Sequence, residues 1–444
     1  ARHSGARDIF RWNRAAGCYE CAVIPDSDEL VRLDKAHLWH PFTPMREWCA
    51  ADHEPLILVE GKGCMLRDRH GREYLDGNAS IWTNIHGHGH PAVKAALHEQ
   101  IDRVAHTSFL GFTNPPAIRL AQELTGLFPG GKLSRGFYSA DGSTAIEAAA
   151  RIGLRCWRAD GRPERDTIVA FDRAYHGDTL GAASLGGIPL FKGGAGTFGY
   201  RVIRVPDLEA LDDLPADERS RIAAVIIEPL IQGAAGMRLW PPGMLRTLDD
   251  WCGRQDAFLI LDEVMTGFGR PGRMFACEHE GVVPDFIALA KGLTGGCLPL
   301  AATLTTERVF EGFLEDENTF FYGHSYCGSQ LGCAAALASL RVFREERTLE
   351  TLAPKISLLA DLLAELKALP SVTETRQCGL IAAVDLGCSP PGTGSRICIT
   401  ARKHGLLTRP ILNTIVLMPP LTITTSEMRS MTTAIRDAIT EVCG

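Results

Sequence analysis

Two short apolar runs, each followed by a charged residue, constrain the fold of this chain more than any other feature. Both lie between Ala257 and Gly296, where AFLIL is followed by Asp262 and FIALA by Lys291. Aliphatic runs of this length, bounded by turn signals, are typical of strands buried in parallel α/β sheets. Ligands of such sheets bind just beyond the carboxyl ends of the strands. The sequence therefore predicts an acid and an amine at the same edge of one sheet.

Three further apolar runs upstream repeat this pattern: GFYSA, TIVAF and IAAVII. Tyr175 and His176 follow the second of them, and Glu228 follows the third. A single polar residue at a strand end is often a satisfied core group, whereas four such ends at one edge indicate a site. We therefore expect Tyr175, Glu228, Asp262 and Lys291 to converge at the edge of a large, mostly parallel sheet.

The segment DGSTAIEAAARIGLRCW follows GFYSA and changes from small polar residues to Ala-rich helical periodicity. This change predicts a strand, a glycine turn and a helix N-terminus with Glu147 in its first turn. Backbone N–H groups at a helix N-terminus bind phosphate well. Gly142, Ser143 and Thr144 are therefore candidate phosphate ligands, although an ordinary capping box would explain the same pattern.

The lysine and the acid suggest a particular chemistry. Burial at a crowded strand end lowers the pKa of a lysine, because it disfavours the charged form, and a neutral amine can attack an aldehyde. Asp262 could also neutralise Lys291 in a structural ion pair. The phosphate-type turn and the aromatic strand-end residue favour the first interpretation, since together these groups could hold pyridoxal phosphate by its phosphate, ring face and ring nitrogen.

Length and composition narrow the class of protein. A chain of 444 residues predicts two packed domains. The net charge of -7 and the lack of Lys/Arg-rich runs argue against binding to nucleic acid or anionic membranes. No apolar run approaches the roughly 20 residues of a transmembrane helix, and we find no signal-peptide core. The 14 scattered cysteines suit a reduced, cytosol-like compartment, or an organelle if the N-terminus is a processed remnant.

Two groups of residues resemble metal ligands. Cys18 and Cys21 form a CxxC pair without a second pair, and a zinc site needs further ligands. His86, His88 and His90 would fall on one side of an extended segment. Their interleaved glycines, however, suit a tight loop before a helix that Pro91 opens. We expect no metal at either place.

The organisation along the chain suggests four segments. Residues 1–28 have no clear periodicity and are expected to be an arm of unknown role. Residues 29–84 contain the proline-rich HLWHPFTPM and a hairpin pattern, and we assign them to a small domain. Residues 85–335 form the large domain. Residues 336–444 complete the small α+β domain, with strands at GLIAAVDL and TIVLMPPL and two amphipathic helices, one from Leu352 to Leu366 and one from Met428 to Val442.

Residues 30 to 444 also resemble a known family. LILDEVMTGFGRPGRMFACEH, the 29-residue step from Asp262 to Lys291, and AKGLTGG are similar to the class III, ω-type, pyridoxal-phosphate aminotransferases. The resemblance implies the pyridoxal-phosphate transferase fold type I, with a mostly parallel sheet flanked by helices and a smaller α+β domain. It also implies pyridoxal phosphate as the cofactor and a homodimer that shares its active sites.

The resemblance further implies roles for the predicted site residues. Lys291 would bond covalently to the cofactor and carry a proton, Asp262 would hold the pyridine nitrogen, and Tyr175 would stack on the ring. Gly142 and Ser143 would bind the phosphate.

Other implied roles lie farther away in the chain. Glu228 would belong to the cofactor site, and Ser325 would reach the phosphate of the neighbouring subunit's cofactor. Phe42 and Trp82 would line the substrate pocket together with Tyr175 and Lys291, and Arg409 would pair with a substrate carboxylate, a task that suits a guanidinium.

Five further motifs resemble the branch of the family that aminates 8-amino-7-oxononanoate to 7,8-diaminononanoate in biotin synthesis: HLWHPFTPM, DGNASIWTNIHGHGHP, AYHGDTLGA, GHSYCGSQLGCAAAL and TRPILNTIVLMPPL. We expect S-adenosylmethionine as the amino donor. Lysine is the alternative donor. Phe42 stands where many members of the family have Tyr, and Ser325 where Thr is usual, and both features resemble a branch in which some members use lysine. EPLIQG is one residue longer than the usual EPxQG, so Gln232 receives no role. The competing hypotheses are another ω-aminotransferase, acting on a diamine or ω-amino acid, and a non-catalytic regulator.

Overall fold

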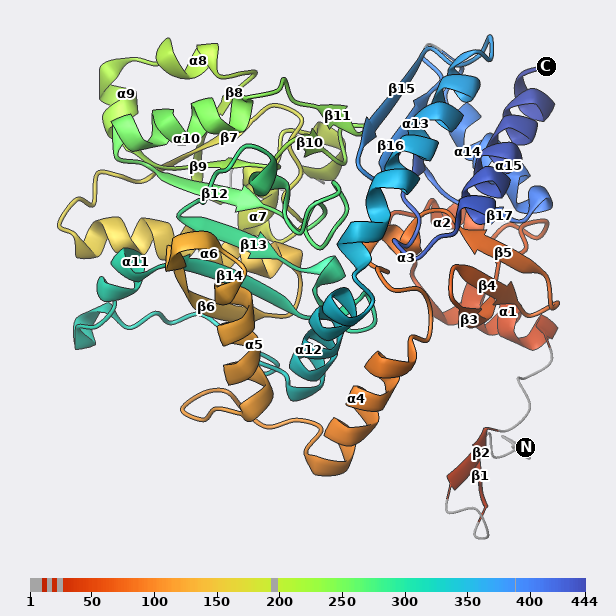
Figure 1. Ribbon diagram of the computed structural model, residues 1–444, viewed down its shortest axis with the longest axis horizontal. Coiled ribbons are helices and arrows are strands. Elements are labelled where there is room, and N and C mark those ends of the chain that lie inside the picture. Colours follow the sequence, from red (N-terminus) through yellow and green to blue (C-terminus); the bar gives the residue numbers. More distant parts are fainter. Residues whose placement is uncertain (1–9, 14–17, 22–26, 193–198, 388) are drawn as a thin grey trace, which may run out of the picture. The chain divides into compact units, whose positions relative to one another are not determined.

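The computed structural model describes residues 10–13, 18–21, 27–192, 199–387 and 389–444 (Figure 1). The chain divides into two compact units. Unit 1 contains residues 1–60 and 66–73, and unit 2 contains residues 61–65 and 74–444. The domain boundaries expected from the sequence, at residues 28, 84 and 335, stay a prediction.

Unit 1 is small and consists of short elements. Strands β1 (Phe10–Asn13) and β2 (Cys18–Cys21) form an antiparallel pair. Helices α1 (Ser27–His37) and α2 (Met45–Trp48) flank a loop, so HLWHPFTPM forms no continuous helix, as its prolines predict. The chain passes between the two units along β3 (Leu58–Lys62) and β4 (Met65–Asp68).

Unit 2 contains a seven-stranded sheet with the order β6-β14-β13-β12-β9-β7-β8 (Figure 1). Its strands are β6 (Leu133–Ser139), β7 (Thr167–Phe171), β8 (Arg201–Val205), β9 (Ile222–Ile227), β12 (Phe258–Asp262), β13 (Phe286–Leu289) and β14 (Ala301–Thr306). Only β14 runs antiparallel to its neighbours. All five predicted strands are therefore confirmed in one mostly parallel sheet, whereas β8 and β14 were not predicted.

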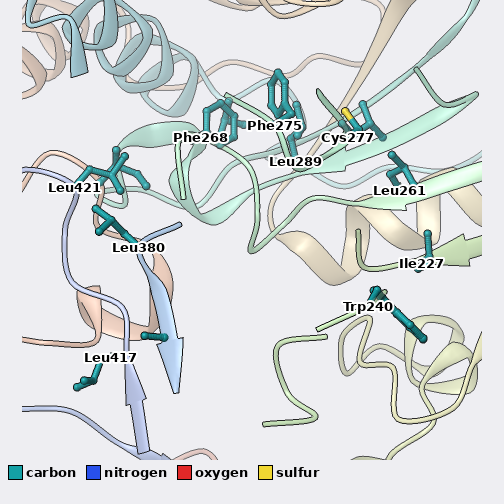
Figure 2. Close-up of a cluster of buried hydrophobic side chains, with 14 of the residues drawn as sticks. Ile227, Trp240, Leu261, Phe268, Phe275, Cys277, Leu289, Leu380, Leu417 and Leu421 are labelled. Carbon is teal, nitrogen blue, oxygen red and sulfur yellow. The ribbon is translucent and has the colours of Figure 1, made fainter. Parts of the chain in front are cut away.

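The sheet is buried on both faces, which explains its unbroken apolar runs. In β12, Phe258 and Ile260 pack in a cluster with helix α6 (Gly142–Ala159), whereas Leu259 and Leu261 belong to a second cluster. Figure 2 shows Leu261 in this second cluster with Leu289 and Ile227 from the neighbouring strands. Alternate residues of one strand thus face two separate cores.

Unit 2 contains further α-helices and 3₁₀ turns. The α-helices are α3 (Ala79–Trp82), α4 (Pro91–Arg103), α5 (Pro115–Gly126), α7 (Leu180–Leu185), α8 (Glu209–Asp212), α9 (Ala216–Ser220), α10 (Met244–Gln255), α11 (Glu307–Glu311) and α12 (Gln330–Glu345). The 3₁₀ turns are η1 (Pro129–Gly131), η2 (Pro189–Lys192), η3 (Ala276–His279), η4 (Lys291–Thr294), η5 (Asp316–Asn318), η6 (Thr348–Thr351) and η7 (Arg402–His404). Pro91 opens α4, as predicted.

The C-terminal part of unit 2 has a four-stranded antiparallel sheet with the order β15-β16-β19-β18. Its strands are β15 (Glu374–Cys378), β16 (Ile381–Asp385), β18 (Pro410–Ile411) and β19 (Thr414–Leu417), and its helices are α13 (Leu352–Lys367), α14 (Thr393–Ala401) and α15 (Thr425–Cys443). The two predicted helices and both predicted strands are confirmed. Strands β15 and β18 and helix α14 were not predicted.

Two short strand pairs complete unit 2. Strand β17 (Leu406–Leu407) pairs in parallel with β5 (Glu73–Asp76), and β10 (Ile231–Gln232) forms a hairpin with β11 (Arg238–Leu239). The predicted fold class, α/β with an additional α+β part, is confirmed. In the part of the chain that the structure describes, no helix has both the length and the apolar character needed to cross a membrane.

Candidate active site

A cavity of about 530 Å³ lies at the carboxyl edge of the seven-stranded sheet. Four predicted side chains line it from the ends of three strands and the loop after a fourth: Tyr175, Glu228, Asp262 and Lys291. Gly142, Ser143 and Trp82 line the same cavity. The structure therefore brings together most of the residues that the sequence analysis selected.

Asp262 is held by groups on both of its carboxylate oxygens. Nδ1 of His176 lies 2.8 Å from Oδ2, and the N–H of Val264 donates to Oδ1 over 3.1 Å. His176 and Asp262 are both buried, and Nε2 of His176 has no partner among the described residues. The carboxylate is thereby fixed in orientation at the cavity wall. His176 was predicted to lie at the carboxyl end of the strand TIVAF, but we assigned it no role.

Lys291 begins the η4 turn directly after β13, with a positive φ of 37°. A positive φ is uncommon for a residue other than glycine, and such strain is concentrated at functional sites. Nζ lies 4.7 Å from the centroid of the Trp82 ring. Burial lowers the pKa of Lys291, although the charges of Asp262 and Glu228 oppose this effect. The amine therefore loses its proton more readily than an exposed lysine.

Glu228 joins two loops at the edge of the cavity. Its Oε1 accepts the backbone N–H of Tyr175 over 3.1 Å, and its Oε2 accepts that of Gly233 over 2.9 Å. Burial raises the pKa of Glu228 to about 7, and the neighbouring Asp262 adds to this effect. Through these two hydrogen bonds, Glu228 holds in place the backbone that carries Tyr175.

The ring of Tyr175 forms part of the cavity wall. Its hydroxyl donates to Oδ2 of Asp178 over 2.7 Å, and its ring packs edge to face against Phe191 with centroids 5.3 Å apart. Burial, aided by Asp178, raises the pKa of Tyr175, so the hydroxyl stays protonated at neutral pH. The side chain is thus anchored at its tip and on one edge, which leaves it suited to pack against a flat ring.

The N-terminus of α6 supplies the glycine turn that the sequence predicted. Asp141 caps the helix by accepting the N–H of Thr144 over 3.0 Å, and the N–H of Asp141 donates to the Thr144 hydroxyl over 3.1 Å. The expectation that Glu147 lies in the first turn was wrong, because the helix already begins at Gly142. Glu147 lies in the second turn and accepts the Gly181 N–H over 2.8 Å.

Close packing surrounds this helix terminus. A Cβ atom on Gly142 would lie 2.7 Å from Val264, and one on Gly177 would lie 2.2 Å from Oγ of Ser143. The Ser143 hydroxyl accepts the N–H of Asp178 over 3.2 Å. The first N–H groups of a helix have no intrahelical partner, so those of Gly142 and Ser143 are available to an anion in the cavity.

Other selected residues lie away from the cavity lining. Ser325 is exposed in the turn before α12, and Arg409 lies between β17 and β18, where its carbonyl accepts the Val416 N–H over 3.3 Å. Phe42 belongs to unit 1. The roles of these three residues stay predictions. Gln232, to which we assigned no role, is buried and donates to the Asp172 carbonyl over 2.9 Å.

The three candidate metal-binding histidines have separate protein partners, each 2.9 Å from the ring Nε2. The pairs are His86 with Ser339, His88 with Asp76, and His90 with Glu346. Among the described residues no three His, Cys, Asp or Glu side chains form a group suited to a metal ion. The side chains of Cys18 and Cys21 lie outside the described part of the structure.

Comparison with known proteins agrees with this architecture. Residues 49–439 match the family model described as aminotransferase class-III. Two relatives are named adenosylmethionine-8-amino-7-oxononanoate aminotransferase. The one from Nitratidesulfovibrio vulgaris is 46% identical and covers 93% of this chain and 82% of its own length. The one from Geobacter sulfurreducens is 42% identical and covers 94% and 99%.

Solved structures show the same similarity. A crystal structure of adenosylmethionine-8-amino-7-oxononanoate aminotransferase from Methanocaldococcus jannaschii has a TM-score of 0.90 and 36% identity, covering 94% of this chain and 100% of that one. An (S)-enantioselective omega-transaminase from Thermomicrobium roseum has a TM-score of 0.89 and 32% identity, covering 94% and 99%. The chain therefore belongs to the class-III aminotransferase family and has the fold of the fold type I transferases.

Proposed function

We propose that this protein is a pyridoxal-phosphate-dependent aminotransferase that converts 8-amino-7-oxononanoate to 7,8-diaminononanoate in biotin synthesis. The observation that carries the proposal is the placement of Lys291, Asp262 and the α6 N-terminus around one cavity. The names of the relatives support the choice of substrate.

The residues of the cavity fit the cofactor. Gly142 and Ser143 offer N–H groups and a hydroxyl to its phosphate, and Tyr175 offers a ring face. Asp262 offers a fixed carboxylate to the pyridine nitrogen, and Lys291 offers an amine with a lowered pKa to the aldehyde. When bound, pyridoxal phosphate supplies that aldehyde and a ring that withdraws electrons from the reacting carbon.

The protein's own groups then orient the substrate and move protons. Lys291 would take up or release a proton at Nζ, and its lowered pKa makes the release easier than from an exposed lysine. Asp262 keeps a proton on the pyridine nitrogen, and His176 holds Asp262 in the orientation that this task requires. Tyr175 would pack against the ring of the bound cofactor.

We propose that Trp82 and Arg409 bind the substrate, and the role of Phe42 stays a prediction from the family resemblance. Trp82 lines the cavity beside Lys291, and its indole offers apolar surface to the carbon chain of 8-amino-7-oxononanoate. Arg409 is proposed to pair with the carboxylate at the other end of that chain, because a guanidinium binds a carboxylate in a bidentate manner.

S-adenosylmethionine is the proposed amino donor, and lysine is the alternative. The two are distinguished by offering each of them alone to the cofactor-loaded enzyme and following the loss of the aldehyde-form absorbance. We expect S-adenosylmethionine to react, with a modest preference over lysine. A reaction with lysine alone would overturn this assignment.

The proposal includes a homodimer in which Ser325 reaches the phosphate bound by the partner subunit. Large apolar side chains are exposed near Ser325, with Phe321 at 90% and Tyr326 at 60% exposure, and in the loop after α4, with Leu110 at 70% and Phe112 at 71%. Exposed apolar groups of this kind mark interaction surfaces. Sedimentation of the wild type should show a dimer, and Phe321→Asp together with Phe112→Asp should weaken it.

The scattered cysteines support a cytoplasmic or another reduced compartment.

The test of cofactor binding compares two half-buried lysines. The wild type should acquire an absorbance band near the boundary of the visible and violet ranges with pyridoxal phosphate, and Lys291→Ala should lack it. Lys355 also has a pKa lowered by burial, but it donates to the Leu421 carbonyl and lies outside the cavity lining. Lys355→Ala should therefore keep the band. A wild type that stays colourless with added cofactor would contradict the proposal and favour the non-catalytic regulator.

A further inference from the structure

Residues 79–82, the ASIW segment of α3, form a left-handed turn. The φ angles are 44° for Ala79, 51° for Ser80, 71° for Ile81 and 69° for Trp82. The ψ angles of Ser80 and Ile81 are 41° and 56°, in the left-handed helical region. Residues other than glycine visit this region as single residues, and four in succession are disfavoured at every step. The surrounding structure must therefore hold the turn.

Asp76 supplies bonds that hold it. Its Oδ1 accepts the backbone N–H of Ser80 over 3.1 Å and that of Asn78 over 3.4 Å. Its Oδ2 accepts the Ser80 hydroxyl over 3.0 Å and lies 2.9 Å from Nε2 of His88. Asp76 is only 2% exposed, so these bonds replace the water that its carboxylate gives up on burial. Two of the four bonds go to Ser80 in the turn, a third goes to Asn78 just before it, and the fourth joins the carboxylate to His88.

The turn ends at the Trp82 ring in the cavity. Nε1 of Trp82 donates to Oδ1 of Asn78 over 2.9 Å, which fixes the ring relative to the start of the turn. One contact of the ring is Nζ of Lys291, 4.7 Å from its centroid. Gly233 lies near the ring, because a Cβ atom built on it would be 3.4 Å from Trp82. The ring therefore has little freedom while the turn is left-handed.

A close backbone approach follows the turn. A Cβ atom on Gly296 would lie 2.4 Å from the Thr83 carbonyl oxygen, and Gly296 itself has a positive φ of 87°. Thr83 and Gly296 both line the cavity. A change of hand between residues 79 and 82 would move Thr83 and Trp82 together, and with them one wall of the substrate site.

We propose that Asp76, braced by His88, is a positioning residue that holds this left-handed turn and thereby sets the place of the Trp82 ring beside Lys291. The turn determines how tightly the carbon chain of the amino acceptor fits. This inference rests on the proposed function for the identity of the acceptor. It assigns Asp76 no contact with the substrate or the cofactor.

The test uses a glycine rescue. Asp76→Ala removes the carboxylate that accepts hydrogen bonds from the turn. In the double variant Asp76→Ala/Ile81→Gly, residue 81 can adopt a positive φ without the carboxylate, because glycine enters that region freely. Ile81 is 49% exposed, so its replacement removes no core packing. Ile399 in α14 is 56% exposed and provides the matched control, since glycine there relieves no positive φ. If Asp76→Ala does not fold, Asp76→Asn replaces it in the single variant and in the two double variants with Ile81→Gly and with Ile399→Gly.

We expect Asp76→Ala to raise the KM for 8-amino-7-oxononanoate about 10- to 100-fold, as loss of one or two charge-assisted bonds would, with a smaller change in kcat. The KM of the double variant Asp76→Ala/Ile81→Gly should return to within about threefold of the wild-type value, since glycine removes the strain of the positive φ. The variant with Ile399→Gly should not recover. Equal recovery with both glycines, or an unchanged KM in Asp76→Ala, would overturn the proposal.

A crystal structure of the cofactor-loaded Asp76→Ala protein provides a readout besides activity. We expect negative φ angles within residues 79–82 and a displaced Trp82 ring. An unchanged turn and ring would overturn the proposal. Failure of the proposed function would look different, because the wild type itself would then not aminate 8-amino-7-oxononanoate, while the crystal structure would still test the role of Asp76.

Discussion

Replacing Gly177 by alanine tests whether the N-terminus of α6 binds the phosphate of the cofactor. Gly177 has a φ of 119°, and a Cβ atom there would lie 2.2 Å from Oγ and 2.6 Å from Cβ of Ser143. The backbone conformation costs about 1 to 3 kcal/mol for a residue with a side chain. The overlap costs about 1 to 3 kcal/mol more, unless Ser143 moves. We therefore expect Gly177→Ala to displace Ser143.

A displaced Ser143 loses a hydrogen bond to a charged phosphate. Such a bond contributes about 1.5 to 3 kcal/mol, which corresponds to a rise of about 10- to 150-fold in the Kd of the cofactor. The assay titrates cofactor-free protein with pyridoxal phosphate and follows the visible absorbance. A thermal melt of the same samples separates loss of binding from loss of folding.

Gly161 is the matched control for this change. Its φ of 73° is also positive, but no atom lies within 4 Å of a Cβ built there. Gly161→Ala should lower stability by about 1 kcal/mol and leave the Kd unchanged. If folded Gly177→Ala binds the cofactor as tightly as Gly161→Ala does, Ser143 and the α6 N-terminus do not hold the phosphate.

Three further predictions concern single side chains. Arg409→Ala should raise the KM for 8-amino-7-oxononanoate far more than that for the donor, and Arg409→Lys should recover only part of it; equal effects on both substrates would argue against a carboxylate role. Burial raises the pKa of Glu228 from its ordinary 4.5 to about 7, so its stabilising contribution is present below pH 4.5 and lost as the pH rises through 7. Urea unfolding of cofactor-free wild type and Glu228→Gln should show the wild type losing stability relative to the variant across this range, and a constant difference would refute the shift. The pKa of Lys291 is lowered, so the unfolded chain binds more protons and the cofactor-free wild type should gain stability relative to Lys291→Met as the pH rises from 7 toward 10.5. A gap that widens in favour of Lys291→Met would contradict this sign.

Local sequence was sufficient for the strands that carry the site. β12 and β13 are buried on both faces, so their apolar runs are continuous, and the charges of Asp262 and Lys291 after them are conspicuous. β14 escaped prediction because its AATLTT contains buried threonines. Thr303 donates to the Ala145 carbonyl over 2.8 Å, and Thr305 donates to that of Asp285 over 2.9 Å. These partners lie far away in the chain, so propensity alone cannot reveal them. β8 is an edge strand with two arginines, which breaks the apolar pattern.

The supports of the site were less accessible to sequence reasoning than the site itself. His176 and Asp262 are 86 residues apart, and only the sheet brings them within a hydrogen bond. The left-handed turn at residues 79–82 contradicts the local preferences of Ala, Ser, Ile and Trp, because the buried carboxylate of Asp76 overrides them. Glu147 was placed one turn too early, because α6 already begins at Gly142, and its bond to the Gly181 N–H joins residues that are distant in the sequence. Such features depend on tertiary contacts that periodicity does not encode.

The central claim is the transfer of an amino group to 8-amino-7-oxononanoate. It is tested most directly by loading the protein with pyridoxamine phosphate and offering 8-amino-7-oxononanoate and 2-oxoglutarate in separate single-turnover reactions. We predict that the aldehyde-form absorbance appears faster with 8-amino-7-oxononanoate and that mass spectrometry detects 7,8-diaminononanoate. A reaction with 2-oxoglutarate alone would contradict the claim and identify a different ω-aminotransferase.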